Sequence, residues 1–216
     1  MRIALLIQKN YDFVFDLLKT SIPLLEPKHK IAGIVCFPDR LGCHQGWNVY
    51  KKCWEIFGPK TFFKLCIKSF KKRAKQWGNY FLGRTPYVTF RGLSAFHEIP
   101  FLHFSNPQDP SLAQWVRENN IDCLLIFIDY ILKRGLIEAP RMGSLNKHAS
   151  LLPANRGLWP VFWSLLKEEA LGVTFHVVTE GIDTGPIVLQ KAYERQKGLS
   201  VYDYYQLIFQ ETPLFE

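Results

Sequence analysis

The sequence of 216 residues lacks the patterns that mark several common protein classes. Its five cysteines form no CxxC pair and no zinc-type spacing, so neither a metal site nor a disulfide framework is predicted. We expect reduced thiols that mostly pack as small apolar side chains. No apolar run approaches the roughly 20 residues that span a bilayer, and no signal-peptide pattern follows Met1. These absences favour a soluble, cytoplasmic protein.

Glycine is missing where a nucleotide-binding fold would need it. The turn after the first apolar run reads Gln8-Lys9-Asn10-Tyr11-Asp12, and no GxGxxG or GxxxxGK[ST] motif occurs elsewhere. Backbone amides approach a phosphate closely only when such a turn contains glycine. Nicotinamide, flavin and P-loop nucleotide chemistry are therefore poorly supported.

The residues that are present indicate a globular α/β protein. Apolar residues make up 48% of the chain, which excludes disorder, and the length suits a single domain over residues 1–216. Apolar runs alternate with helical patterns, which predicts a Rossmann-like, mainly parallel sheet. The predicted strands are residues 2–8, 30–37, 99–104, 122–128, 144–149, 173–178 and 187–193, and the predicted helices are 12–22 (ended by Pro23), 111–119, 159–169 and 200–210.

The positive charge of the chain is concentrated in one segment. The formal net charge is +8, and residues 51–75 contain nine basic residues and one acid, so this segment accounts for the whole surplus. It lies within residues 41–90, which separate the second predicted strand from the next by roughly 60 residues where a simple crossover needs about a dozen. We therefore predict a basic helical insertion over residues 41–90, after the second strand.

A helix from Pro59 to Gly78 is predicted inside this insertion. In one interpretation, its apolar stripe packs on the domain and its lysines are solvated. In the other, the helix is a docking surface for phosphate, nucleic acid or anionic lipid headgroups, and charge alone does not separate these partners. The apolar stripe consists of Phe62, Phe63, Cys66, Ile67, Phe70, Ala74 and Trp77, and the lysine stripe of Lys60, Lys64, Lys68, Lys71 and Lys75.

Residues 143–190 contain the side chains with the clearest chemical meaning. Asn146 and His148 are two residues apart on a predicted strand, so they point to the same face. An amide that holds a carbonyl oxygen beside an imidazole that moves a proton suits acyl transfer. Asp183, in a following loop, could orient the imidazole and stabilise its charge. A single Asn-x-His on a strand is usually structural, and the ordered combination is more specific.

This ordered combination resembles the signature of the N10-formyltetrahydrofolate-dependent formyltransferase family. The catalytic Asn, His and Asp of that family match Asn146, His148 and Asp183, and its Ser-Leu-Leu-Pro turn matches Ser150–Pro153. The resemblance covers about residues 95–212, the first 40 residues fit the fold generally, and residues 41–90 match no known element. It implies an α/β fold of the formyltransferase type and an enzyme that transfers a formyl group from N10-formyltetrahydrofolate to a primary amine.

The resemblance also implies roles for individual residues. Asn146 would donate a hydrogen bond to the formyl oxygen, His148 would stabilise the oxyanion and move the proton of the amine, and Asp183 would hold His148. His176 is expected near the site, in a structural role. The residues expected to bind folate, largely through backbone groups, are Ile128, Asp129, Tyr130, Leu132 and Glu180. Arg156 could contact an anionic acceptor. Two plainer explanations fit equally well: Glu180 as a solvated loop acid, and Arg156 as an arginine that stabilises its turn.

The acceptor amine is less well defined. The glycine-free first turn argues against a glycinamide ribonucleotide enzyme. An amino-sugar nucleotide or a similar anionic small amine is the first expectation, and a methionyl-tRNA-type acceptor is the alternative that the basic insertion favours. Two further possibilities stay open, a formyltetrahydrofolate hydrolase that acts on water and a non-catalytic module that binds RNA or a membrane through residues 51–75.

Overall fold

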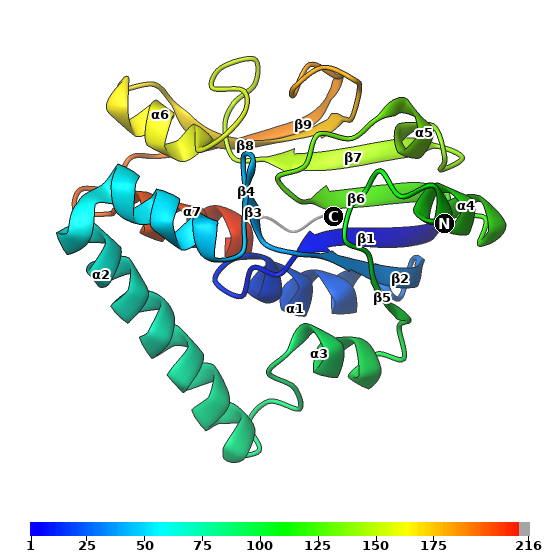
Figure 1. The fold of residues 1–216 in the computed structure, drawn as a ribbon, viewed down its shortest axis with the longest axis horizontal. Coiled ribbons are helices and arrows are strands. Elements are labelled where there is room, and N and C mark those ends of the chain that lie inside the picture. Colours follow the sequence, from blue (N-terminus) through cyan, green and yellow to red (C-terminus); the bar gives the residue numbers. More distant parts are fainter. Residues whose placement is uncertain (212–216) are drawn as a thin grey trace.

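The computed structural model describes residues 1–211 and is built around a seven-stranded sheet (Figure 1). The strand order is β5-β2-β1-β6-β7-β8-β9. The pairs from β5 to β7 are parallel, whereas β7–β8 and β8–β9 are antiparallel. The mainly parallel sheet is thus confirmed. The strands are β1 (Arg2–Gln8), β2 (Lys30–Phe37), β5 (Phe101–His103), β6 (Cys123–Phe127), β7 (Gly143–His148), β8 (Leu171–Val177) and β9 (Ile187–Tyr193).

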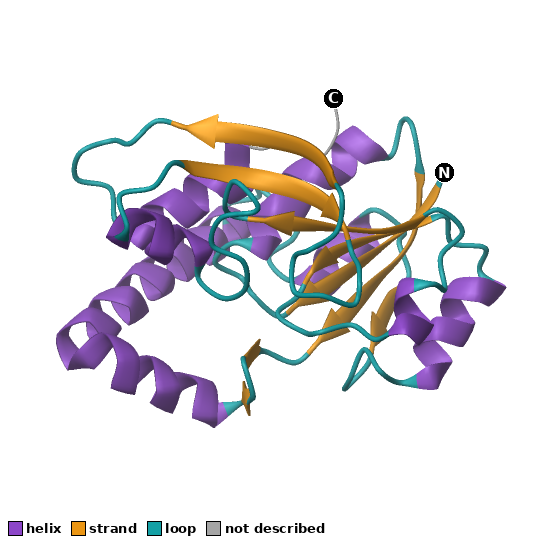
Figure 2. Cartoon of the chain, turned by 90° about the horizontal axis from the view of Figure 1, so that it is seen from above, coloured by secondary structure: helices purple, strands orange, loops and turns teal. Residues whose placement is uncertain are grey.

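Helices cover both faces of this sheet (Figure 2). On one face, α1 (Val14–Leu25), α3 (Phe90–Phe96), α6 (Pro160–Leu166) and α7 (Val201–Glu211) contribute to one apolar core. On the other face, α4 (Pro110–Glu118) and α5 (Arg134–Ile137) contribute to a second core. Because both faces are covered, the central strands β1, β2 and β6 are nearly continuous apolar runs with almost every residue buried.

Several local predictions need correction. Helix α1 does not stop before Pro23 but continues to Leu25, which is buried against the sheet. Proline near a helix end removes one amide donor, and the burial of Leu25 offsets that loss. The sequence patterns also missed α3, α5 and a short antiparallel hairpin of β3 (Arg40–Leu41) and β4 (His44–Gln45), because all of these elements are too short to show a period.

Helix α2 (Trp47–Phe81) is longer than predicted and packs with the opposite face. It is kinked at Gly58, whose φ of 71° and ψ of 164° are non-helical, so two helical segments join there. No residue of α2 is fully buried. Of the apolar stripe that was expected to pack on the domain, only Phe62 is half-buried, while Phe63, Ile67 and Phe70 are exposed.

The expectations about cysteines and the membrane have different outcomes. All five cysteines are free thiols, but only Cys36 and Cys123 are buried, while Cys43 and Cys66 are exposed on the β3–β4 turn and on α2. The expectation that they mostly pack in the core is therefore wrong. Among residues 1–211, no helix combines the length and the apolar character needed to cross a bilayer, and no cluster of three or more potential metal ligands is present.

Candidate active site

Strand β7 presents its alternate residues to two different environments. Asn146 and His148 lie on one face near the carboxyl end of the strand, at the edge of the sheet where α/β proteins bind ligands. Lys147 lies on the other face, where its Nζ donates a hydrogen bond of 2.8 Å to the Ile208 carbonyl of α7. The predicted alternation is therefore confirmed, and it separates the amide and the imidazole from the charge of the lysine.

The neighbouring strand adds His176 to this face. In the antiparallel register of β7 and β8, Asn146 is paired with His176 and His148 with Thr174. The Nδ2 of Asn146 lies 3.2 Å from Nε2 of His176, which is buried. Sequence analysis placed His176 near the site but gave it a purely structural role. The cross-strand pairing is the signal that would have brought it into the set of interacting groups.

Asp183 links the three side chains. One carboxylate oxygen, Oδ2, lies 3.3 Å from Nδ1 of His148, and the other, Oδ1, lies 3.4 Å from both Nε2 of His176 and Nδ2 of Asn146. The amide of Gly157 donates a 2.8 Å hydrogen bond to Oδ2. Burial raises the pKa of the Asp183 carboxyl, but these hydrogen bonds and the nearby imidazoles outweigh it, so its pKa lies below the ordinary value.

A close backbone approach holds the Asp183 loop in place. Asp183 itself has a positive φ of 48°, which Asp tolerates better than most residues. A Cβ atom on Gly185 would lie 1.8 Å from the carbonyl oxygen of Val177, so only glycine fits there. Next to it, the Val177 amide donates to the Pro186 carbonyl at 2.9 Å. The Asp-Thr-Gly-Pro sequence therefore fixes the position of the carboxylate.

Both ring nitrogens of His148 face oxygen atoms. Nε2 lies 2.9 Å from the Asn155 carbonyl, and Nδ1 faces Asp183. Two acceptors favour a doubly protonated ring, whereas burial favours the neutral form. Burial is the larger influence, and it lowers the pKa of the His148 imidazole below its ordinary value, although Asp183 and the Asn155 carbonyl oppose it. The imidazole therefore sits in a setting where it can both accept and release a proton.

Asn155 is a site residue that sequence analysis missed. Its carbonyl holds His148, while its side-chain amide donates to Ser164 Oγ and to a carboxylate oxygen of Glu169 at 2.9 and 2.6 Å. It has a positive φ of 52°, a conformation in which Asn is enriched among non-glycine residues. The position of Asn155 in the turn after Pro153 is the only sequence signal that could have suggested this role.

The residues expected to bind folate lie in the loop between β6 and α5 and in the β8–β9 loop. Tyr130 and Leu132 are buried, and the Tyr130 hydroxyl donates to the Pro38 carbonyl at 3.1 Å. Ile128 is half-buried and packs beside the same core. Asp129 is held by Gln8, which accepts from its amide at 2.8 Å. The side chains of Tyr130 and Leu132 therefore belong to the core, which leaves the loop backbone to face a ligand.

Glu180 and Arg156 occupy exposed positions around the site. Glu180 lies in the β8–β9 loop, three residues before Asp183. Arg156 lies between Asn155 and Gly157, the two residues whose backbones hold His148 and Asp183. Within residues 1–211 its guanidinium has no hydrogen-bond or ion-pair partner, so it is free to contact a ligand near the site. The sequence-based expectation for Arg156 remains a prediction.

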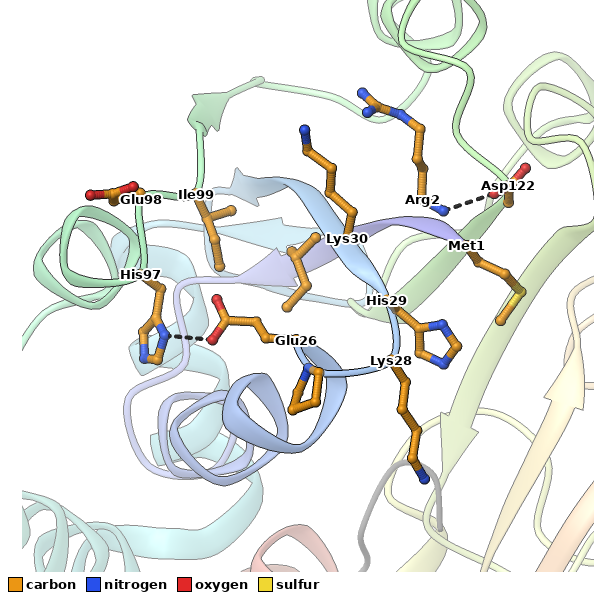
Figure 3. A pocket seen from close by; sticks show the side chains of 12 residues that line it. Met1, Arg2, Glu26, Lys28, His29, Lys30, His97, Glu98, Ile99 and Asp122 are labelled. Atoms are coloured by element: carbon orange, nitrogen blue, oxygen red, sulfur yellow. Dashed lines mark hydrogen bonds and ion pairs between the residues drawn. The ribbon is translucent and has the colours of Figure 1, made fainter.

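A cavity of about 850 Å³ lies at the opposite edge of the sheet (Figure 3). It is lined by residues at the amino ends of strands, including Arg2 and Lys30, and by Glu26 and His97, which interact at 3.0 Å. The residues with predicted chemical roles lie at the carboxyl ends of the strands. This cavity is therefore separate from the candidate active site.

The fold and the geometry at the edge of β7 define a class of protein. It is an α/β protein with an Asn-His-Asp group at strand β7, where the sheet changes from parallel to antiparallel pairing. A family model described as formyl transferase matches residues 87–212, which is more than half of the chain. The chain therefore belongs to the formyl transferase family. This match includes Asn146, His148 and Asp183 and leaves out α2.

Individual relatives and a solved structure agree with this family. The chain is 50% identical over 62 residues, or 28% of its length, to methionyl-tRNA formyltransferase from Thermodesulfovibrio yellowstonii, where the match spans 20% of that protein. It is 33% identical over 121 residues to the Geobacter metallireducens methionyl-tRNA formyltransferase, covering 54% of this chain and 39% of that protein. The chain thus spans well under half of these relatives. Glycinamide ribonucleotide transformylase 1 from Symbiobacterium toebii shares the fold, with a TM-score of 0.63, 21% identity and coverage of 98% of this chain and 81% of that one.

Proposed function

We propose that the protein transfers a formyl group from N10-formyltetrahydrofolate to a primary amine. The observation that carries this proposal is the group of Asn146, His148 and Asp183, in which one carboxylate lies within 3.4 Å of the imidazole and of the amide. The chain belongs to a family named for this group transfer, and the three residues lie inside the matched region.

The reaction divides between the three groups as follows. The amine nitrogen attacks the formyl carbon, the carbonyl oxygen gains negative charge, and the bond between that carbon and N10 breaks. Asn146 donates a hydrogen bond to the oxygen through Nδ2. His148 accepts the proton that the amine loses and passes it toward N10, which leaves as the free amine of tetrahydrofolate. Asp183, ionised because its pKa is lowered, stabilises the charged imidazole between these steps.

The donor would lie against the β6–α5 loop. The side chains of Tyr130 and Leu132 point into the core, while Ile131 between them is exposed, so the loop offers backbone amides and carbonyls to a planar heterocycle. Such groups match the donors and acceptors of a pterin ring. These features fit a folate donor, with Ile128 contributing backbone groups and Asp129 its carbonyl, because the Asp129 amide already donates to Gln8.

For the acceptor, we propose first an amino-sugar nucleotide or a similar anionic small amine. Arg156 is exposed in the loop whose neighbouring residues Asn155 and Gly157 hold His148 and Asp183, so its guanidinium is available to bind a phosphate of the acceptor. A methionyl-tRNA is the second candidate. Two observations support it. The relatives that the chain resembles are methionyl-tRNA formyltransferases, and α2 carries many basic residues.

An acceptor panel tests these alternatives. The protein is incubated with N10-formyltetrahydrofolate and an amino-sugar nucleotide, methionyl-tRNA, glycinamide ribonucleotide or buffer alone, and tetrahydrofolate release is followed. We expect release that depends on an amino-sugar nucleotide and falls when Arg156→Ala is used. Turnover with methionyl-tRNA alone would favour the second candidate, and equal release in buffer would indicate hydrolysis. No release with any acceptor, while the His148→Ala variant behaves identically, would contradict formyl transfer.

A further inference from the structure

Helix α2 is attached to the domain by its polar face. Ser69 Oγ donates to the Asp12 carboxylate at 2.8 Å, and Lys72 forms an ion pair of 2.6 Å with Asp16 of α1. Lys68 pairs with Asp203 of α7 at 2.9 Å. Acidic side chains of the domain therefore hold the face of α2 that carries Lys68, Ser69 and Lys72, and the apolar face is turned outward.

The outward face carries a continuous apolar stripe. Phe63, Phe70 and Phe81 are 57%, 73% and 77% exposed, and Ile67 and Trp77 are exposed between them. With exposed Ala74 between Phe70 and Trp77, they follow one another at steps of three and four residues, which places them on one side of a helix that turns about 100° per residue. Single exposed apolar residues are ordinary, but a stripe of this length on one face marks an interaction surface. Figures 1 and 2 both show α2 along the outside of the molecule.

A row of lysines runs beside this stripe. Lys60, Lys64, Lys71 and Lys75 are exposed, and within the described part of the chain none of them forms an ion pair or a hydrogen bond. No Asp or Glu occurs between Pro59 and Phe81. The surface therefore combines exposed aromatic and aliphatic side chains with exposed lysines along one edge of the stripe. Lys60 and Lys64 lie along the first part of this edge, and Lys71 and Lys75 also border a groove that they share with Asp16 and Asp203 of the domain.

We propose that this face of α2 docks on an anionic phospholipid bilayer. The apolar stripe would enter the boundary between headgroups and acyl chains, and the adjacent lysines would contact the phosphates, as basic amphipathic helices do at interfaces. Charge complementarity selects this partner. A second copy of the chain would bring two lysine rows together, which is unfavourable. A nucleic acid would neutralise the lysines but leave Ile67 and much of the aromatic stripe in water.

Vesicle sedimentation with the full chain tests this surface. The protein is mixed with vesicles of phosphatidylcholine alone or of an equal mixture of phosphatidylcholine and phosphatidylglycerol. We expect binding to the mixed vesicles that weakens as salt rises, and little binding to the neutral vesicles. The Lys64→Gln/Lys71→Gln/Lys75→Gln variant should bind the mixed vesicles about 100-fold more weakly, because each lysine near an anionic surface contributes to binding.

Two further variants make the test specific. Phe63→Gln/Phe70→Gln/Phe81→Gln should also lose vesicle binding, because the stripe would no longer enter the bilayer. A matched control that removes the same charge elsewhere, Lys28→Gln/Lys30→Gln/Arg117→Gln, should bind as the parent does. Every changed side chain is exposed, so we expect all three variants to fold. Circular dichroism and thermal melts check this.

Four results would overturn the proposal. Equal binding to both kinds of vesicle, or binding that survives the aromatic substitutions, would exclude insertion of the stripe. Binding to RNA in a gel-shift assay, lost with the lysine variant and kept with the aromatic variant, together with no vesicle binding, would assign the face to nucleic acid. A dimer in analytical ultracentrifugation that the aromatic variant dissociates would assign it to a second copy.

Discussion

The candidate active site buries polar side chains, whereas helix α2 exposes apolar ones. At the edge of β7, His148, His176 and Asp183 are withdrawn from water and satisfied by one another. On α2, phenylalanine side chains face solvent, and lysines hold the helix to Asp16 and Asp203. The comparison teaches that a periodic pattern identifies a face, whereas the chemistry of the neighbouring surface decides whether that face is buried.

The largest expected effect comes from the imidazole at the buried edge. His148→Ala should lower kcat for formyl transfer by about 10²–10⁴, because the proton of the amine loses its acceptor. Asn146→Ala should lower it by about 10²–10³ through loss of an oxyanion donor. The same change at exposed His103 is the control and should leave the rate unchanged. Near-parent turnover by folded His148→Ala would refute the assignment.

The next largest loss of activity is expected when the Asp183 carboxylate is displaced but not replaced. Gly185→Ala places a Cβ against the Val177 carbonyl, so the loop that carries Asp183 must shift. A displacement of an ångström in a positioning group costs about 10²-fold in rate. Gly78→Ala on α2 is the matched control, since a Cβ there meets nothing within 4 Å. Equal activity of the two variants, measured as tetrahydrofolate release, would show that the loop tolerates the shift.

The reverse side of β7 predicts a dependence of stability on pH. Burial lowers the pKa of Lys147 to about 7, whereas in the unfolded chain it keeps its ordinary value of about 10.4. Between these values the unfolded state binds more protons, so the free energy of unfolding rises with pH, by up to about 1.4 kcal/mol per pH unit. Lys147→Met should flatten this rise.

Thermal or urea unfolding between neutral and alkaline pH measures this effect. Lys19→Met, at an exposed position of α1, is the control and should leave the slope intact. A slope that is the same in the parent and in Lys147→Met would mean that the amine is not desolvated in the folded protein.

The electrostatic coupling between His148 and Asp183 can be tested through the pKa of the imidazole. Burial lowers the pKa of His148, and the Asp183 charge opposes it, so Asp183→Asn should lower that pKa further. NMR titration of the imidazole resonances gives the midpoint directly. Glu118→Gln, which removes a carboxylate from exposed α4, should not move it. A midpoint that rises in Asp183→Asn would contradict the geometry.

The smallest effects concern the attachment of α2. The Lys72–Asp16 pair is half-buried and short, so Lys72→Met should lower the free energy of unfolding by about 1 kcal/mol. The Lys68–Asp203 pair is more exposed, and Lys68→Met should cost less than about 0.5 kcal/mol. Urea unfolding compares the two. The opposite ranking would mean that α2 is held mainly at α7.

The sequence predicted the sheet well because its central strands are recognised by apolar content alone. It also predicted Asn146 and His148 on one face, since side-chain direction alternates along a strand whatever the neighbours are. It did not reveal the contribution of His176, which depends on the register between two strands. Nor did it reveal Asn155, whose backbone carbonyl contacts His148, because every residue type carries that group.

The orientation of α2 was beyond prediction for a different reason. The apolar stripe was correctly recognised as one face, but its burial was expected from hydrophobicity alone. The surface available to the helix carries Asp12 and Asp16, from the start of the α1 region, and Asp203 of α7, and these two segments are far apart in the sequence. Only the folded domain brings these acids together, so the preference for the face that carries Lys68, Ser69 and Lys72 emerges with the tertiary structure.

The hydrogen bond between Lys147 and Ile208 has a mechanical consequence. Helix α7 is joined to α2 by the Lys68–Asp203 pair and to β7 by the Lys147–Ile208 bond. A load applied to the outer helix therefore reaches the strand of Asn146 and His148 through a single intervening helix and two polar contacts. Asn146 and His148 on one face of β7 share the strand backbone with Lys147 on the other face. We therefore expect a tilt of α7 to move the His148 imidazole.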